Sequence, residues 1–239
     1  MKMSEEKRIS RKNVESMFDR IAPDYDKFNH ILSAGIDRRW RREVVGILSE
    51  SSENKYIADF ATGTGDLAIA LADEVHPTTL IGLDISNEML QVAKSKVQKH
   101  KLEQIISLKK ENCENTSLPD SCMDAVTTSF GIRNFNSPEN GLKEMRRVLR
   151  PEGKAVILEF STPRKGLVAS FVKWYYNHII PFVGNLISKT KAPYRYLPAT
   201  IYEFPDGERF CTMMRDAGFR NVHYKSLTFN MVNIYIGER

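Results

Sequence analysis

The sequence predicts an α/β fold in which a doubly wound, mostly parallel β-sheet is covered by helices. Between residues 55 and 161, short apolar runs alternate with segments of helical spacing, as in βαβ units. A glycine-rich turn, residues 61–66 (ATGTGD), directly follows the first apolar run, the usual arrangement in nucleotide-type folds. The chain has 239 residues, 41% of them hydrophobic, so we expect one domain over residues 1–239 with a packed core.

An N-terminal helical cap is expected over residues 1–50. Helical spacing begins near residue 10, with breaks around residues 22–23 and 33–35. Residues 38–43 (RRWRRE) are rich in arginine, which fits either a solvated helix face or contact with an anionic surface. The first residues (MKMSEEKRISRKN) are polar, so no signal peptide is expected.

The core, residues 55–161, is expected to supply the parallel strands and the helices between them. Strands are predicted at residues 56–60, 79–84, 105–108, 125–129 and 154–160. Helices are predicted at residues 67–74, from the capping residue Ser86 to His100, and at 138–149, with a turn at 151–153.

The regular alternation stops after residue 161. Residues 162–218 are expected to form a helical insert, and residues 219–239 a final strand pair. Residues 167–187 are apolar enough to suggest a membrane span, but Lys173 lies within them, and a charge at bilayer depth costs ~2.5–3.5 kcal/mol. A helix with a large apolar and aromatic face is therefore expected instead, and insert and cap together could roof a pocket at the carboxyl edge of the sheet.

Carboxylates around the glycine turn indicate the kind of ligand. Asp59 precedes the turn and Asp66 opens the next helix, where a dinucleotide would place its pyrophosphate. Two carboxylates there would repel phosphate and favour a cation, so we expect S-adenosylmethionine, which carries a sulfonium and an ammonium group. Asp84, at the end of the second strand, can accept hydrogen bonds from both ribose hydroxyls.

Further candidate ligands of S-adenosylmethionine lie in the turn and at later strand ends. Asn112 can read the adenine edge, and Ser129 can meet the methionine part. Cys113 fits either ligand binding or core packing. The full expected set is Asp59, Thr62, Gly63, Thr64, Gly65, Asp84, Asn112, Cys113 and Ser129. The cysteines, at positions 113, 122 and 211, show no metal-ligand spacing, so neither a metal nor a disulfide framework is expected.

Several motifs resemble the menaquinone/ubiquinone C-methyltransferases: residues 25–40 (YDKFNHILSAGIDRRW), ATGTGD at 61–66, SFGIRN at 129–134, RVLRPEG at 147–153, LEFS at 158–161 and YRYL at 194–197. The resemblance covers the chain from about residue 10 to its end. Phe28, Asp37 and Glu152 depart from the usual family residues, which are Met, His and Gly. The resemblance implies a class I, Rossmann-like methyltransferase fold with seven strands, of which the last is antiparallel.

The activity that this resemblance implies is C-methylation of a reduced prenylated quinone, converting demethylmenaquinol to menaquinol. A benzoquinol of ubiquinone biosynthesis and another small aromatic acceptor remain alternatives. A non-catalytic binding module is disfavoured because the glycine turn and Asp84 are present. An RNA methyltransferase is disfavoured because no nucleic-acid-binding motif is visible.

Four residues are the candidates for catalysis. Arg133 is expected to hold the phenolate of the acceptor and Asn134 to orient the ring or a water. Tyr25, or Asp26 through a water, is expected to handle the proton. His178, in the insert, is a rival base, although a single histidine among aromatic residues is more often structural.

The remaining expectations concern partners and location. A prenylated substrate lives in the bilayer, so we expect reversible contact with the membrane surface. Lys and Arg number 35 against 30 acidic residues, a net charge of +5, which fits an anionic surface. We expect a cytoplasmic protein peripherally associated with the inner face of the membrane, without nucleic-acid partners. A homodimer is one oligomeric state that the sequence allows.

Overall fold

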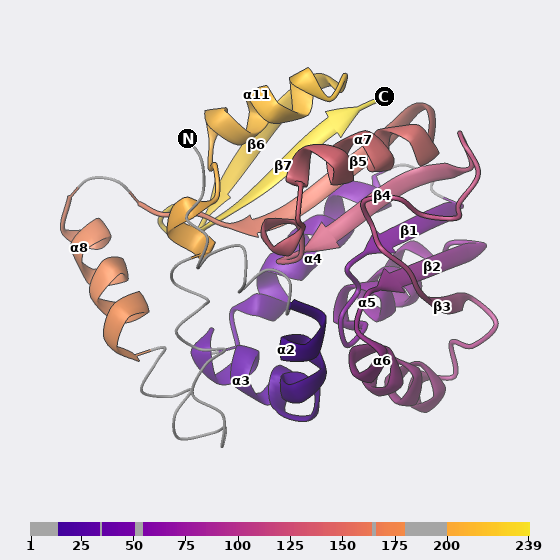
Figure 1. The fold of residues 1–239 in the computed structure, drawn as a ribbon, viewed down its shortest axis with the longest axis horizontal. Helices are drawn as coiled ribbons and strands as arrows, with labels where there is room; N and C mark the ends of the chain where they lie inside the picture. Colours follow the sequence, from indigo (N-terminus) through magenta and orange to yellow (C-terminus); the bar gives the residue numbers. More distant parts are fainter. Residues whose placement is uncertain (1–13, 34, 51–54, 164–165, 180–199) are drawn as a thin grey trace.

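A computed structural model describes residues 14–33, 35–50, 55–163, 166–179 and 200–239 (Figure 1). Seven strands form one sheet in the order β3-β2-β1-β4-β5-β7-β6. The strands are β1 (Tyr56–Phe60), β2 (Thr79–Asp84), β3 (Ile106–Lys110), β4 (Met123–Ser129), β5 (Leu149–Phe160), β6 (Arg220–Leu227) and β7 (Val232–Glu238). Only β7 is antiparallel to its neighbours, which confirms the predicted sheet.

Helices cover both faces of this sheet. They are α2 (Val14–Ile21), α3 (Tyr25–Leu32), α4 (Asp37–Ser49), α5 (Asp66–Val75), α6 (Asn87–His100), α7 (Pro138–Val148), α8 (Gly166–Trp174) and α11 (Glu208–Asp216). Short turns of helix occur at Ala22–Asp24, Ile132–Asn134 and Tyr175–Ile179. Among the described residues, no helix is both long and apolar enough to cross a bilayer.

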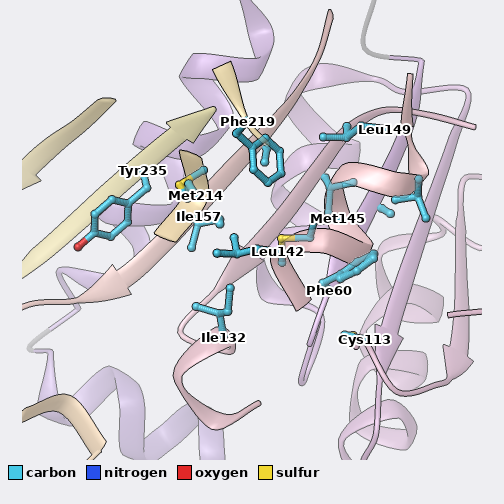
Figure 2. Close-up of a cluster of buried hydrophobic side chains, with 14 of the residues drawn as sticks. Phe60, Cys113, Ile132, Leu142, Met145, Leu149, Ile157, Met214, Phe219 and Tyr235 are labelled. Carbon is cyan, nitrogen blue, oxygen red and sulfur yellow. The ribbon is translucent and has the colours of Figure 1, made fainter. Parts of the chain in front are cut away.

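The core has two halves, one on each face of the sheet. Successive residues of β1 serve both, because side chains alternate along a strand: Ile57 packs with residues of α4 and α5, and Ala58 with residues of α7 and α11. Both residues are completely buried. Figure 2 shows the second half, in which Leu142 and Met145 of α7 lie close to Phe60.

Strand β5 differs from its predicted extent. It begins at Leu149 rather than Lys154, so the expected turn at 151–153 lies inside the strand. The pairing with β4 shifts register between Met123 and Ala125, and Glu152 adopts a φ of 65°, a conformation that favours glycine. The shifted register and the positive φ of Glu152 show that the backbone does turn locally at 151–153, although the strand continues past this point.

The described parts of the cap and of the insert lie next to each other. Helices α2 and α3 lie beyond the ends of the strands, beside α6, and α8 lies on the opposite side of the cap from α6 (Figure 1). Within the insert, Val172 of α8 and Ile201 pack with Phe28 of α3. Residues 180–199, which include the YRYL segment, lie outside the described residues.

Two helical glycines provide a test of the packing. A Cβ on Gly141 of α7 would lie 2.4 Å from Cδ2 of Phe135, whereas a Cβ on Gly46 of α4 would meet nothing within 4 Å. Gly141→Ala should therefore lower the free energy of unfolding by about 1–3 kcal/mol through overpacking. The matched variant Gly46→Ala should raise it by up to about 1 kcal/mol, because alanine is the better helix former. Urea unfolding followed by circular dichroism measures both, and equal shifts would contradict the assigned contact.

Candidate functional site

A cavity of about 330 Å³ lies at the carboxyl edge of the sheet. Its walls come from the segments that follow β1, β2, β3 and β4, and residues of α2 and α3 cover it. The lining residues are Val14, Glu15, Phe18, Tyr25, Ala61, Gly63, Asp84, Ile85, Met89, Glu111, Asn112, Cys113, Glu114, Ser129, Phe130, Gly131, Asn134, Phe135 and Asn136. The volume is within the range of small-ligand pockets.

The glycine turn forms one wall through its backbone. Gly63 lines the cavity, has a φ of 56°, and has no atom within 4 Å of the position that a Cβ would occupy. A ligand can therefore approach its backbone closely. Gly65 has a φ of 80° and would bring a Cβ within 3.2 Å of Cβ of Ala93, so its lack of a side chain allows α5 and α6 to pack.

Asp84 is the carboxylate that faces the cavity from β2. It accepts hydrogen bonds of 2.8 Å from the backbone N–H groups of Gly63 and Ser86. Burial raises its pKa to about 6, although these two bonds oppose the rise. The arrangement leaves an ionisable oxygen pair at the cavity, where ribose hydroxyls could donate to it.

Asp59 and Asp66, which were predicted to face the ligand, do not line the cavity. Asp59 is buried and accepts hydrogen bonds of 2.7 Å from the hydroxyls of Thr62 and Thr127, and burial raises its pKa to about 6. Asp66 pairs instead with Lys96 of α6 and, at 3.4 Å, with Arg41 of α4. Asp59 therefore stabilises the turn from the side away from the cavity, and Asp66 connects α5 to α4 and α6.

Other acids supply the negative lining that the sequence assigned to that pair. Besides Asp84, the side chains of Glu15, Glu111 and Glu114 border the cavity. Glu15 of α2 is paired with Lys110 at 2.7 Å. Glu111 accepts a hydrogen bond from the N–H of Ser117, and Glu114 accepts one from the N–H of Asn136. The acids at the cavity thus come from α2, β2 and the segment after β3, and not from the glycine turn.

The three residues predicted at later strand ends all line the cavity. The Oγ of Ser129 is buried and has no hydrogen-bond partner among the described residues, so it is available to a polar ligand. Asn112 caps its own loop, with Oδ1 accepting from the N–H of Glu114 at 3.0 Å. The thiol of Cys113 accepts from the N–H of Ala61 at 3.3 Å, and burial raises its pKa, so this thiol is a neutral packing group of the turn.

Asp26 and Thr64 join the cap to the core. The Thr64 hydroxyl donates to Asp26 at 2.5 Å, and Lys96 of α6 binds Asp26 at 2.8 Å. Neither Asp26 nor Thr64 lines the cavity. Nearby, Asp19 of α2 accepts from the Ser86 hydroxyl at 2.6 Å. In this structure Asp26 therefore connects the cap to the glycine turn and to α6, and does not face the cavity.

Tyr25 and Asn134 lie on the cavity wall. Tyr25 packs edge-on against Phe18 of the cap at 6.2 Å between ring centroids. Its pKa is raised by burial, while Asn29 and the positive charge of Arg133 oppose the rise. Asn134 contacts the carbonyl of Phe130 at 3.4 Å. Tyr25 thus brings a neutral phenol from the cap to the wall of the cavity.

Arg133 does not line this cavity but lies just beyond it. Its guanidinium is 5.1 Å from the ring centroid of Phe160, which packs with Phe130 and Trp40. Arg133 is buried and paired at 2.6 Å with Glu159 of β5. Glu159 was not among the predicted site residues, although a glutamate after the apolar run AVIL at 155–158 was an available signal.

His178 lies away from this arrangement. Its ring is exposed and stacks on Trp174 at 5.9 Å between centroids, and its Nδ1 lies 3.0 Å from the carbonyl of Trp174. It does not line the cavity. The position agrees with the structural alternative for this histidine.

Two solved structures share the fold. A SAM-dependent methyltransferase from Aquifex aeolicus superposes with a TM-score of 0.60 at 18% identity, over 83% of this chain and 88% of that chain. The [4+2]-cyclase SpnF superposes with a TM-score of 0.67 at 14% identity, over 96% of each chain. At these identities the likeness establishes the fold alone.

Sequence relatives are much more similar. A demethylmenaquinone methyltransferase of Bacteroides fragilis is 44% identical over 226 residues, covering 95% of this chain and 92% of the relative. A ubiquinone/menaquinone biosynthesis C-methyltransferase UbiE of Geotalea uraniireducens is 41% identical over 227 residues, covering 95% and 96%. The ubiE/COQ5 methyltransferase family matches residues 1–239. The chain therefore belongs to the ubiE/COQ5 methyltransferase family, an assignment that agrees with the motifs in its sequence and with its fold.

Proposed function

We propose that this S-adenosylmethionine-dependent methyltransferase methylates a ring carbon of a reduced prenylated quinone, converting demethylmenaquinol to menaquinol. The relatives named demethylmenaquinone methyltransferase support this acceptor. One observation carries the proposal: an acid-lined cavity suited to a cationic donor lies beside a buried guanidinium suited to a phenolate. A benzoquinol is the second candidate, because other relatives carry the name ubiquinone/menaquinone biosynthesis C-methyltransferase.

The donor would be held by the groups that face the cavity. The carboxylate of Asp84 would accept from the ribose hydroxyls, and the unpartnered hydroxyl of Ser129 would bind the polar methionine end. The open backbone at Gly63 leaves room for this contact. When bound, S-adenosylmethionine supplies the methyl group as an electrophilic carbon on a sulfonium. Asp59 and Thr62 are proposed to act indirectly, by fixing the turn.

On the acceptor side, the protein must favour the ionised hydroxyl of the quinol. A phenol has a pKa of about 10, and a nearby positive charge lowers it. Arg133 is proposed to hold the phenolate, since its own proton is too firmly bound for base catalysis. Asn134 orients the ring or a water, and Tyr25, at the cavity wall, passes on the proton.

The cap is proposed to exclude water while the donor is bound. Helix α2 lines the cavity and is held by the Asp19–Ser86 hydrogen bond. The Asp26–Thr64–Lys96 contacts hold the start of α3. Water exclusion strengthens electrostatic interactions in the site. We propose that Asp26 contributes to this closure, and proton handling by Asp26 through a water stays a prediction.

Membrane contact belongs to the proposal as the route to a prenylated acceptor. Large apolar side chains are exposed on the cap, the insert and the β6–β7 hairpin: Ile31 is 51%, Trp174 50% and Phe229 78% exposed. Exposed Arg38 and Arg39 lie at the start of α4, where they would meet anionic headgroups. A peripheral position at the inner face of the membrane and a homodimer stay part of the proposal.

Asp84→Asn tests the donor site. A hydrogen bond to a charged group contributes about 1.5–3 kcal/mol, so affinity for S-adenosylmethionine should fall by roughly tenfold to a hundredfold. In the wild type, affinity should be full above the pKa of Asp84, about 6, and should decline as pH falls below it, because protonation removes an acceptor. Isothermal titration calorimetry between about pH 5 and 8 measures the loss of affinity in the variant and the pH dependence of affinity in the wild type. The exposed Asp73→Asn is the matched control, and equal affinities would contradict the assignment.

Arg133→Gln tests the acceptor side. Methyl transfer from labelled S-adenosylmethionine to reduced demethylmenaquinone should proceed with the wild type and fall by roughly a hundredfold to a thousandfold in kcat for the variant, as for loss of one anion-stabilising donor. Donor affinity should stay near the wild-type value, because Arg133 does not line the donor cavity. Arg146→Gln, on the outer side of α7, is the control. Equal loss of kcat and donor affinity would contradict the role.

Sedimentation with vesicles tests the membrane contact. The protein should sediment with vesicles rich in anionic lipid at low salt and less so at high salt, because headgroup attraction is screened. A combined substitution of Arg38 and Arg39 by Gln should weaken this association, whereas Arg146→Gln should not. Absence of association at both salt concentrations would contradict membrane contact and leave the methylation assay unaffected.

A further inference from the structure

Glu159 is a completely buried carboxylate at the end of β5. Its Oε1 accepts from Nη1 of Arg133 at 2.6 Å and from the N–H of Phe160 at 2.7 Å, and its Oε2 accepts from the N–H of Arg133 at 3.3 Å. Both the side chain and the backbone of Arg133 are therefore attached to one acid. Burial raises the pKa of this acid, and the positive charge of Arg133 opposes the rise.

Among the described residues, the Arg133 guanidinium is hydrogen-bonded through Nη1. Nη1 also donates to the carbonyl of Phe130 at 2.6 Å, and Phe160 lies against its face. The Nε atom is buried and has no partner among the described residues. A guanidinium whose Nη1 is committed to Glu159 and whose Nε is unused has a donor left for a ligand.

We propose that Glu159 is a positioning residue for methyl transfer, which fixes the orientation of the Arg133 guanidinium toward the ionised hydroxyl of the acceptor. This inference rests on the proposed function. Glu159 does not touch the acceptor; it acts through Arg133. It also adds a negative charge that partly offsets the pull of Arg133 on the acceptor proton.

A purely structural role explains this pair less well. Burying an ion pair costs desolvation, and such pairs are weak evidence for stability compared with apolar residues of the same size. Glu159 faces the core half built from α7 and α11, where Ile157 precedes it on the same face of β5, so an apolar residue would continue the packing. The three hydrogen bonds instead specify an orientation.

Other ionisable groups near the pair do not provide the same function. Tyr25, from α3, faces Arg133, and Tyr235, from β7, faces Glu159. Burial raises the pKa of both phenols, so both stay neutral at ordinary pH. Asp206 is engaged by the Ser161 hydroxyl at 3.0 Å and by Arg209 at 3.2 Å. Glu159 is the acid bonded to Arg133.

The test compares E159Q, E159D and a matched control in the full-length protein. E159Q keeps the size of the side chain but removes its charge. We expect kcat with reduced demethylmenaquinone to fall by roughly tenfold to a hundredfold, as for a misplaced catalytic group, while the affinity for S-adenosylmethionine is unchanged. The acidic limb of the kcat–pH profile should move to lower pH, because removal of a negative charge makes the acceptor hydroxyl more acidic.

E159D separates position from charge. Its carboxylate is one carbon shorter, so kcat should fall while the acidic limb stays in place. The control is E144Q, which removes the buried acid of another Glu–Arg pair, Glu144 with the partly exposed Arg147 at 2.6 Å. E144Q should lower the melting temperature but leave kcat and the pH profile unchanged.

The outcomes distinguish this inference from the proposed function. An active wild type together with wild-type kcat and pH profile in E159Q would overturn the role of Glu159 alone. A parallel loss of donor affinity and kcat would overturn it as well, because it would indicate general structural damage. Should E159Q fail to fold, wild-type kcat in E159D would overturn it. A wild type that does not methylate the quinol would overturn the proposed function, and this inference with it.

Discussion

The hydrogen bond from the backbone N–H of Gly63 to the carboxylate of Asp84 holds together the two loops that form the cavity wall. It connects the turn after β1 to the end of β2, and a second bond from the same carboxylate to Ser86 reaches the start of α6. Two adjacent strands of a parallel sheet end at one edge, and this carboxylate fixes how their loops meet there. The cavity therefore has a defined wall before any ligand enters, at the cost of an ionisable group kept out of water.

Charge is separated across this edge of the sheet. Acids border the cavity, whereas the positive charge of Arg133 lies outside its lining and is partly offset by Glu159. Trp40, Phe130 and Phe160 form the aromatic wall between cap and sheet. Charges act more strongly on one another beside such an apolar wall than they would in water.

The residues that shape the cavity also hold its roof. Ser86 caps α6 by accepting from the N–H of Met89, and its hydroxyl donates to Asp19 of α2. Lys96, on the same helix, binds Asp26 and Asp66, so α6 anchors both the cap and the start of α5. The cap is therefore attached to α6, which also contributes Met89 to the cavity wall.

The sequence by itself determined the order of strands and helices, because apolar periodicity and turn residues are local signals: strands 56–60 and 79–84 match their predicted bounds. It also determined that Gly63, Asp84 and Ser129 meet, since parallel strand ends share an edge. Only the tertiary structure decided which way each side chain points. Asp59 is hydrogen-bonded to Thr127, Asp26 to Lys96 and Glu159 to Arg133. Each of these pairs joins elements that are far apart in the chain, so no local sequence pattern encodes it.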